Sequence, residues 1–220
     1  RAAVLADRCR AVIASEVDGR LADALRRRFA DRPNVEIREG DFLAEPLPTA
    51  PYKVFANPPF DITSAIVAKL VRAAHPPEDT FLVVQREAAA RYCGGPDETL
   101  AGLLLKPFFA PSVVHEFRRD DFVPAPTVEV VMLRLRKRGP PLIFGANAQA
   151  YRDLVVTGFT AWKPTIGTAL EHAFGPRAAS RLTRAVGLDP ALRPSAVPFS
   201  MWLDVFAAYT RRPDVLRSRV

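Results

Sequence analysis

Strand-like and helix-like segments alternate over the first two thirds of the chain, and this alternation restricts the folds open to it. Short apolar runs lead into segments whose apolar residues recur at helical spacing. The expected strands cover residues 10–15, 34–41, 52–57 and 80–85, and the expected helices cover 20–30, 61–74 and 86–92. Such alternation is typical of a parallel sheet with helices on both faces. The sequence therefore predicts an α/β domain with a ligand site at the carboxyl ends of its strands.

The pattern changes in the second half of the chain. Two strand-like runs, 112–118 and 128–138, follow one another without a helix between them, which favours an antiparallel pair at the edge of the sheet. A joint rich in proline and glycine covers 138–145. Beyond it we expect only helices, at 148–162, 165–174, 176–185 and 198–210. We therefore predict an α/β domain at 1–138 and a small all-helical domain at 145–220.

Composition and charge restrict the location of the protein and its partners. Hydrophobic residues make up 49% of the 220 residues, and no apolar run approaches the roughly 18 residues that span a bilayer. Cys9 and Cys93 are too few for a disulfide framework and fit free thiols in a reducing cytosol. The net charge is +7, and residues 140–220 hold ten Lys/Arg against five Asp/Glu. We expect a cytoplasmic protein with an acidic polymer as partner and no contact with a membrane.

Polar residues stand at the ends of three expected strands: Glu16, Asp41 and Asn57. Each could simply open the following helix, because Asp and Asn are frequent at that position. Carboxylates at the carboxyl ends of parallel strands also accept hydrogen bonds from ribose hydroxyls. Three such residues at successive strand ends favour a nucleoside site.

The stretch ANPPF, residues 56–60, forms a stiff corner directly after the third expected strand. One interpretation is a plain strand-to-helix turn. The other is catalytic: the Asn57 side-chain carbonyl and the Pro58 main-chain carbonyl could each accept one hydrogen of an adenine amine. That arrangement would orient the nitrogen lone pair toward an electrophilic methyl group. Phe60 would then offer a face on which the target base stacks.

A second proline-stiffened loop precedes the last expected strand and carries Phe122. The ring could face Phe60, so that the two clamp a base drawn out of its stack. The alternative is an ordinary proline-rich turn with Phe122 in the core. No metal or covalent nucleophile is needed for such chemistry, and the three histidines, His75, His115 and His172, are scattered along the chain.

Together these segments resemble the ribosomal RNA adenine N6-methyltransferases that use S-adenosylmethionine. The resemblance rests on GDF at 40–42, NPPF at 57–60, QREAAAR at 85–91 and FVPAPTVEVVMLRL at 122–135. It implies a Rossmann-like class I methyltransferase sheet in the first domain and an RNA-binding role for the helical domain. Trp162-Lys163 and the segment 198–212 look more like the Erm-type enzymes of macrolide-lincosamide-streptogramin B resistance, which methylate one adenine of 23S rRNA.

The resemblance implies three sets of site residues. The first set binds the cofactor. In it, Glu16 binds the ribose and Asp41 binds the adenine amine. Val17 and Phe42 flank the adenine ring, and Asn57 lies between the cofactor and the target amine. The second orients the target amine and holds its base: Asn57, Pro58, Phe60 and Phe122. The third is predicted to contact RNA: Arg86 and Arg91 beside the expected cleft, Arg134 and Arg136 in a basic strand end, and Lys163 in the tail. A solvated sheet edge is an equally good interpretation of the basic strand end.

The resemblance predicts methylation of adenine N6 in 23S rRNA by a monomer, at an unpaired or flipped base, with antibiotic resistance as the consequence. Two departures leave alternatives open. The Gly-rich loop that normally holds the methionine end of the cofactor is absent, so we expect a truncated chain. The corner also has proline where Erm enzymes usually have isoleucine, as in amino-methyltransferases that act on DNA. The alternatives are a 16S rRNA adenine dimethyltransferase, a DNA amino-methyltransferase and a non-catalytic RNA-binding protein.

Overall fold

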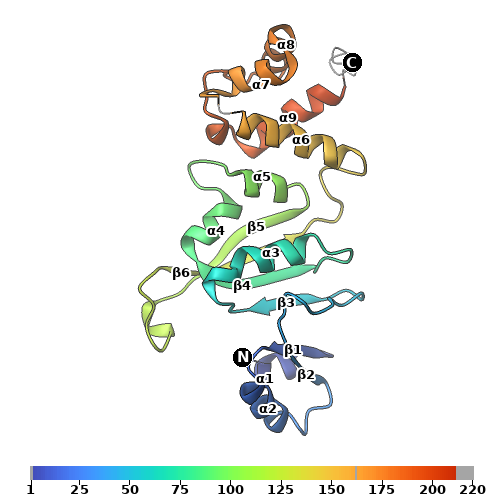
Figure 1. Cartoon of the computed structure of the whole chain (residues 1–220), viewed down its shortest axis with the longest axis vertical. Helices are drawn as coiled ribbons and strands as arrows, with labels where there is room; N and C mark the ends of the chain where they lie inside the picture. Colours follow the sequence, from blue (N-terminus) through green and yellow to red (C-terminus); the bar gives the residue numbers. More distant parts are fainter. Residues whose placement is uncertain (1, 162, 212–220) are drawn as a thin grey trace. The chain divides into compact units, whose positions relative to one another are not determined.

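The computed structural model describes residues 2–161 and 163–211 (Figure 1). In its N-terminal part the elements are α1 Ala2–Ala6, β1 Val12–Glu16, α2 Gly19–Arg28, β2 Val35–Glu39, β3 Lys53–Ala56, α3 Thr63–Val71, β4 Asp79–Gln85 and α4 Arg86–Cys93. They continue with α5 Leu100–Leu105, β5 Phe109–Glu116, β6 Val130–Lys137, α6 Asn147–Thr160, α7 Ile166–Phe174, α8 Pro176–Val186 and α9 Phe199–Thr210. Short 3-10 turns lie at Phe60–Ile62, Arg119–Asp121 and Pro194–Ala196. All the strands and helices expected from the sequence are present, with shifted ends.

The chain divides into two compact units. Unit 1 comprises residues 1–51 and 65–75, and unit 2 comprises 52–64 and 76–220. The four-stranded sheet and the C-terminal helices therefore belong to the same unit. This division differs from the predicted boundary between 138 and 145, so the separate roles of domains 1–138 and 145–220 stay a prediction. None of the described helices is long and apolar enough to cross a membrane.

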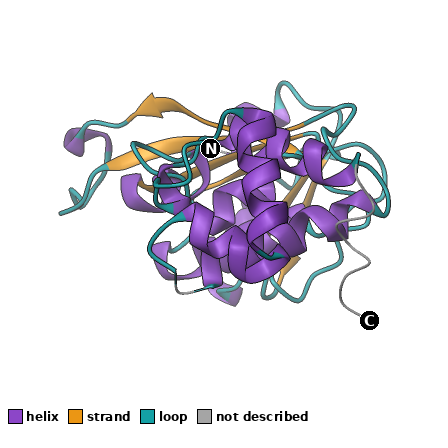
Figure 2. Cartoon of the chain, turned by 90° about the horizontal axis from the view of Figure 1, so that it is seen from above, coloured by secondary structure: helices purple, strands orange, loops and turns teal. Residues whose placement is uncertain are grey.

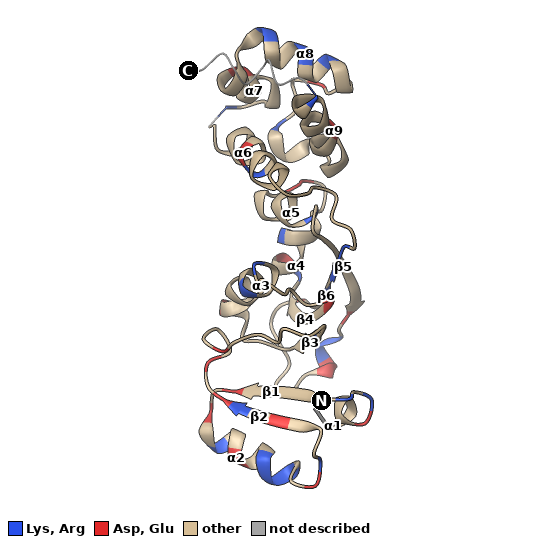
Figure 3. Cartoon of the chain, turned by 90° about the vertical axis from the view of Figure 1, so that its right-hand side faces the viewer, with Lys and Arg blue, Asp and Glu red and all other residues tan. Residues whose placement is uncertain are grey.

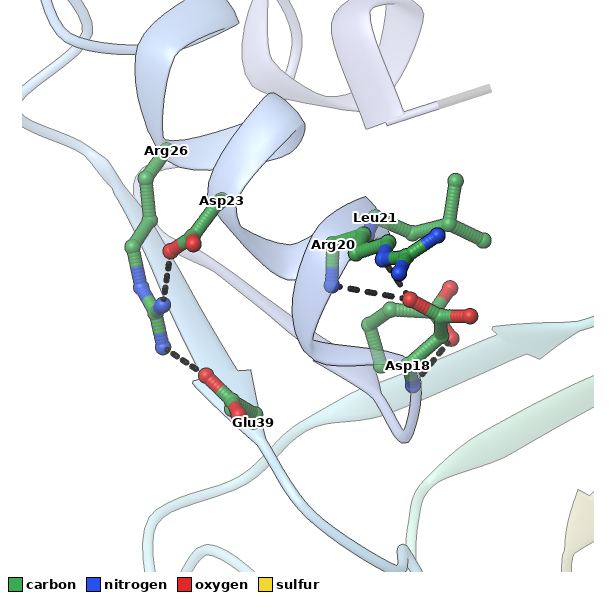
Figure 4. Close-up of polar contacts among 7 residues, drawn as sticks. Asp18, Arg20, Leu21, Asp23, Arg26 and Glu39 are labelled. Carbon is green, nitrogen blue, oxygen red and sulfur yellow. Dashed lines mark hydrogen bonds and ion pairs between the residues drawn. The ribbon is translucent and has the colours of Figure 1, made fainter.

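Unit 1 is built on the parallel pair β1 and β2, whose register runs from Val12 opposite Val35 to Glu16 opposite Glu39. Between these strands, α2 begins after Asp18, whose side chain accepts hydrogen bonds from two backbone amides of the first turn (Figure 4). Arg26 of α2 binds Asp23 and Glu39, which ties the helix to the end of β2 (Figure 4).

Unit 2 contains a sheet with the order β3-β4-β6-β5. β3 and β4 are parallel, whereas β6 runs antiparallel to both of its neighbours, β4 and β5. The predicted antiparallel pair is therefore confirmed, with β5 at the edge and β6 inside the sheet. Leu82, Val83 and Val84 of β4 are all buried, which explains why this strand reads as a continuous apolar run.

The C-terminal helices, drawn in purple with the other helices in Figure 2, surround a core of their own. Leu103 of α5 belongs to this core together with Tyr151, Leu170 and Trp202, and the Tyr151 hydroxyl donates to the Leu103 carbonyl at 3.1 Å. α5 was not expected from the sequence. Its packing joins the segment after α4 to the helical part of unit 2.

Candidate active site

The carboxylates predicted to bind the cofactor lie at the same end of the two-stranded sheet in unit 1. Glu16 is the last residue of β1, and its carbonyl accepts a hydrogen bond from Gly40, just after β2, at 3.0 Å. Its side chain accepts from the Asp18 amide at 3.1 Å, and the Asp41 side chain accepts from the Leu43 amide at 2.8 Å. Each carboxylate is thus oriented by a backbone amide two residues later, and its second oxygen has no partner among the described residues.

The loop after β2 is held by a lysine that the sequence pattern does not reveal. Lys69 of α3 donates to the carbonyls of Phe42 at 2.6 Å, Leu43 at 3.0 Å and Glu45. Its ammonium also lies 5.0 Å from the centre of the Phe42 ring. One cation therefore fixes the segment that directly follows Asp41. The only sequence signal was a single lysine among the apolar residues of an expected helix.

The corner after β3 in unit 2 presents an exposed amide on a buried proline. Asn57 is exposed and makes no side-chain hydrogen bond to the described residues, whereas Pro58 is buried and Phe60 is half-buried. Pro59 has extended backbone angles, and the 3-10 turn starting at Phe60 leads into α3. Asn57 therefore lies at the carboxyl end of β3, and within the described part of the chain its side-chain amide is not hydrogen-bonded.

The loop that carries Phe122 lies at the end of this sheet where β3 and β4 have their carboxyl ends. β6 is antiparallel to β4, so its first residue, Val130, stands opposite Gln85, the last residue of β4. The Phe122 ring is half-buried and meets the Phe117 ring edge-on, with centroids 5.4 Å apart. A hollow of about 450 Å³ opens here, and its lining includes both rings and Arg86 but not Phe60. A contact between Phe60 and Phe122 stays a prediction.

Comparison with known proteins identifies the family. Residues 2–211 match the family described as Ribosomal RNA adenine dimethylase. The chain belongs to this family. An rRNA methyltransferase of Streptomyces thermotolerans is 32% identical over 203 residues, covering 92% of this chain and 68% of the relative. A Ribosomal RNA small subunit methyltransferase A of a Synechococcus strain is 30% identical over 199 residues, covering 87% of this chain and 71% of the relative.

A solved structure supports the same assignment at the level of the fold. The crystal structure of the 23S rRNA methyltransferase ErmE superposes with a TM-score of 0.87 at 30% identity, covering 94% of this chain and 84% of that one. This match confirms the Rossmann-like methyltransferase fold with a C-terminal helical region. The chain spans between about half and seven tenths of the length of the curated rRNA methyltransferases it matches.

Members of the rRNA adenine dimethylase family use S-adenosylmethionine as methyl donor. The residues of unit 1 fit parts of this molecule. Free carboxylate oxygens of Glu16 and Asp41 match donors of the kind offered by ribose hydroxyls and the adenine amine. Val17 is exposed and Phe42 is half-buried, so both have surface for an adenine ring. Their roles, and that of Asn57 beside the methyl group, stay predictions.

The five residues predicted to contact RNA have different surroundings. Arg91 and Lys163 are exposed, and Arg91 donates to the Ser64 hydroxyl at 3.3 Å, close behind the Asn57 corner. Arg134 binds buried Asp79 through two hydrogen bonds of 2.9 and 2.5 Å. Arg136 stands opposite Asp79, so both arginines of β6 lie toward the amino end of β4, away from the predicted cleft.

Arg86 is engaged by two carboxylates, those of Glu116 and Glu129. The guanidinium of Arg86 is therefore already paired within the chain, unlike that of an arginine free to bind RNA phosphate. Trp162, whose sequence likeness supported the Erm-type assignment, lies outside the described residues.

The sequence pattern also did not single out a row of arginines on α8. Arg177, Arg181 and Arg184 are exposed at helical spacing along this helix, which Figure 3 shows in blue. None of the three forms an ion pair with another residue in the described part of the chain. The row is a concentration of free positive charge within the helical part of unit 2.

Proposed function

We propose that the protein transfers a methyl group from S-adenosylmethionine to N6 of an adenine in 23S rRNA. The observation that carries this proposal is the corner Asn57-Pro58-Pro59-Phe60 at the carboxyl end of β3. The Asn57 side-chain amide has no hydrogen-bond partner among the described residues and precedes a buried proline, which suits the recognition of an amine that must be oriented. Relatives named as rRNA adenine methyltransferases and the ErmE structure support rRNA as the substrate.

The chemistry asked of the corner is orientation. The lone pair of an adenine amine is delocalised into the ring, so the amine is a weak nucleophile in its planar form. Accepting its two hydrogens with the Asn57 side-chain carbonyl and the Pro58 carbonyl would direct the nitrogen lone pair toward the incoming methyl group. S-adenosylmethionine supplies that methyl group as an electrophile. Fixed polar groups of this kind are worth about 10²–10³ in rate when one is removed.

The target base must be unpaired or flipped to reach this corner, because a base inside a duplex hides its amine. We propose that Phe60 and Phe122 stack on the extruded adenine. Arg91 of α4 would bind phosphates of the flanking RNA, and so would Lys163 and the arginine row on α8, which would give the helical domain an RNA-binding role. We propose that the enzyme acts as a monomer in the cytoplasm and that methylation protects ribosomes from macrolides.

The test uses the full-length protein, tritiated S-adenosylmethionine and protein-free 23S rRNA. We expect label at one adenine in the wild type and a loss of at least about 10²-fold with Asn57→Ala. Asn57→Asp serves as a matched variant, because it keeps the side-chain carbonyl geometry and adds charge. Cells that carry Asn57→Ala and keep full macrolide resistance would refute the proposed role.

The 16S rRNA of the small subunit is a second candidate substrate. The observation in its favour is the 30% identity to a Ribosomal RNA small subunit methyltransferase A, close to that of the first relatives. Transcribed 16S and 23S fragments, and DNA, should be offered in parallel. Label on 16S alone would keep the mechanism and replace the substrate. RNA binding without label on any of them would favour a non-catalytic RNA-binding protein.

A further inference from the structure

The loop between β5 and β6, residues 117–129, carries Phe122 and is gripped at both ends by one arginine. Arg86 is the first residue of α4. Its guanidinium lies 2.9 Å from Glu116, the last residue of β5, and 2.5 Å from Glu129, the last residue before β6. We propose that Arg86 is a positioning residue that sets the Phe122 loop by bridging Glu116 and Glu129, rather than a contact to RNA.

The main chain strengthens this bridge. The Arg86 amide donates to the Glu129 carbonyl at 3.0 Å, so that side chain and backbone of the same residue hold the same end of the loop. Phe117 donates to the Val130 carbonyl at 3.0 Å and closes the loop from the other side. Since one guanidinium meets both carboxylates, a change in the separation of the two loop ends must break at least one of these contacts.

Contacts within the loop connect its two ends to the Phe122 ring. Arg119 donates to the Pro126 carbonyl at 3.2 Å across the loop. The Asp121 side chain accepts from the Arg118 amide at 2.8 Å, and Phe122 packs edge-on against Phe117. The position of the Phe122 ring is therefore coupled to the strand ends that Arg86 holds.

Charge argues against Arg86 as a phosphate contact. One arginine with two carboxylates carries a net charge of −1, so Arg86 has no uncompensated positive charge to offer a phosphate. Hydrogen bonding from Arg86 lowers the pKa of the Glu116 carboxyl below its ordinary value, so the carboxylate stays charged to lower pH than an ordinary glutamate. Single exposed ion pairs contribute little to stability, so the value of this bridge lies in geometry.

The test is a double variant, Glu116→Gln with Glu129→Gln, in the full-length protein. If Arg86 positions the loop, kcat for methyl transfer should fall about tenfold, whatever the change in KM for RNA, because small misplacements at a reacting base are costly. If Arg86 is a phosphate contact, removing two nearby negative charges should free it, and KM should fall with kcat unchanged. The second result would overturn the proposal.

Matched variants make the comparison specific. Glu87→Gln removes a negative charge from an exposed residue of the same helix that has no ion pair with the described residues, and should leave kcat unchanged. Arg91→Gln removes a positive charge from α4 and should raise KM for RNA, with a shallower salt dependence. Arg86→Lys, which can reach one carboxylate at a time, should give a kcat between the wild type and Arg86→Gln.

The predicted change in kcat rests on the proposed function, whereas the predicted position of the loop does not. Limited trypsin digestion tests the position of the loop by itself. Arg118 and Arg119 are exposed cleavage sites inside the loop. The double glutamine variant should be cut there several-fold faster than the wild type and Glu87→Gln, whether or not any RNA is methylated. Equal rates in all three proteins would overturn the positioning role. Faster cutting of the double variant, together with no methyl transfer by the wild type on any RNA offered, would keep the positioning role and refute the proposed function.

Discussion

Replacement of Lys106 by methionine should measure the ion pair between Lys106, directly after α5, and Glu98, just before this helix. The ammonium lies 2.7 and 2.5 Å from the two carboxylate oxygens of Glu98, and the side chains are only 11% and 15% exposed. Glu98 also accepts from the Phe199 amide at 3.3 Å, and its own amide donates to the Ser195 carbonyl at 2.7 Å. Lys106→Met would leave this carboxylate with one long hydrogen bond.

The expected loss follows from this burial. Breaking a buried pair by removing one partner costs about 3–5 kcal/mol. The amino end of α9, which Glu98 faces, stabilises a negative charge by roughly 0.3–1 kcal/mol, and some solvent reaches both groups. We therefore expect Lys106→Met to lower the free energy of unfolding by about 2–3 kcal/mol. For a chain of this size the melting temperature should fall by about 4–12 °C. Urea unfolding followed by circular dichroism measures the free energy directly.

The matched control is Lys137→Met, in an exposed pair of the same residue types. Lys137 lies 2.9 Å from Glu78, with side chains 35% and 51% exposed, so its loss should cost less than about 1 kcal/mol. The double variant Lys106→Met/Glu98→Gln should recover part of the loss, because no buried charge then remains unpaired. Equal unfolding free energies for Lys106→Met and Lys137→Met would refute the reasoning that burial sets the value of the pair.

Three further predictions follow from single contacts. Lys69→Met should weaken binding of S-adenosylmethionine about tenfold, because one ammonium holds three carbonyls of the loop after β2; unchanged affinity by calorimetry would contradict this. Gly158→Ala should lower the free energy of unfolding in urea by about 1–3 kcal/mol, since its Cβ would lie 2.5 Å from the Trp202 ring; an unchanged value would contradict this. The pKa of Glu116 is depressed, so its contribution to loop order is present above the ordinary carboxyl range and lost as pH falls through the lowered value. The side-chain carboxyl carbon of Glu116 should therefore titrate below the ordinary Glu range in an NMR pH series, and a midpoint within or above that range would refute the assignment.

The elements of the fold could be predicted where the local pattern is strong. The continuous apolar run of β4 and the stretch of α8 between Pro176 and Gly187 were expected close to their observed bounds. The segment expected as one helix from 61 begins instead with a 3-10 turn at Phe60–Ile62, and α3 starts at Thr63. α5 was missed because the residues LAGLLL have no polar face, and so show neither helical nor strand periodicity.

The candidate site was predictable only in part, for a related reason. Glu16, Asp41 and Asn57 follow strand ends, which the local pattern marks. Lys69 and Arg86 act on segments that are more than twenty residues away in the sequence. Local sequence patterns do not reveal contacts between residues so far apart in the sequence. The motif residues can therefore be identified before the structure, while the residues that hold their loops cannot.

Strand register explains why a cluster of arginines in the sequence is a poor guide to the residues that bind RNA. β4 and β6 are antiparallel, with Phe81 opposite Arg134, so Asp79 is the diagonal neighbour on the same face. The Arg134 guanidinium lies 5.3 Å from the centre of the Phe81 ring and reaches Asp79, a pairing that only this register produces. Arg86 meets its two carboxylates through the same sheet. An arginine is therefore a candidate for RNA phosphate when the fold brings no carboxylate to it, and the row on α8 meets that condition within the described chain.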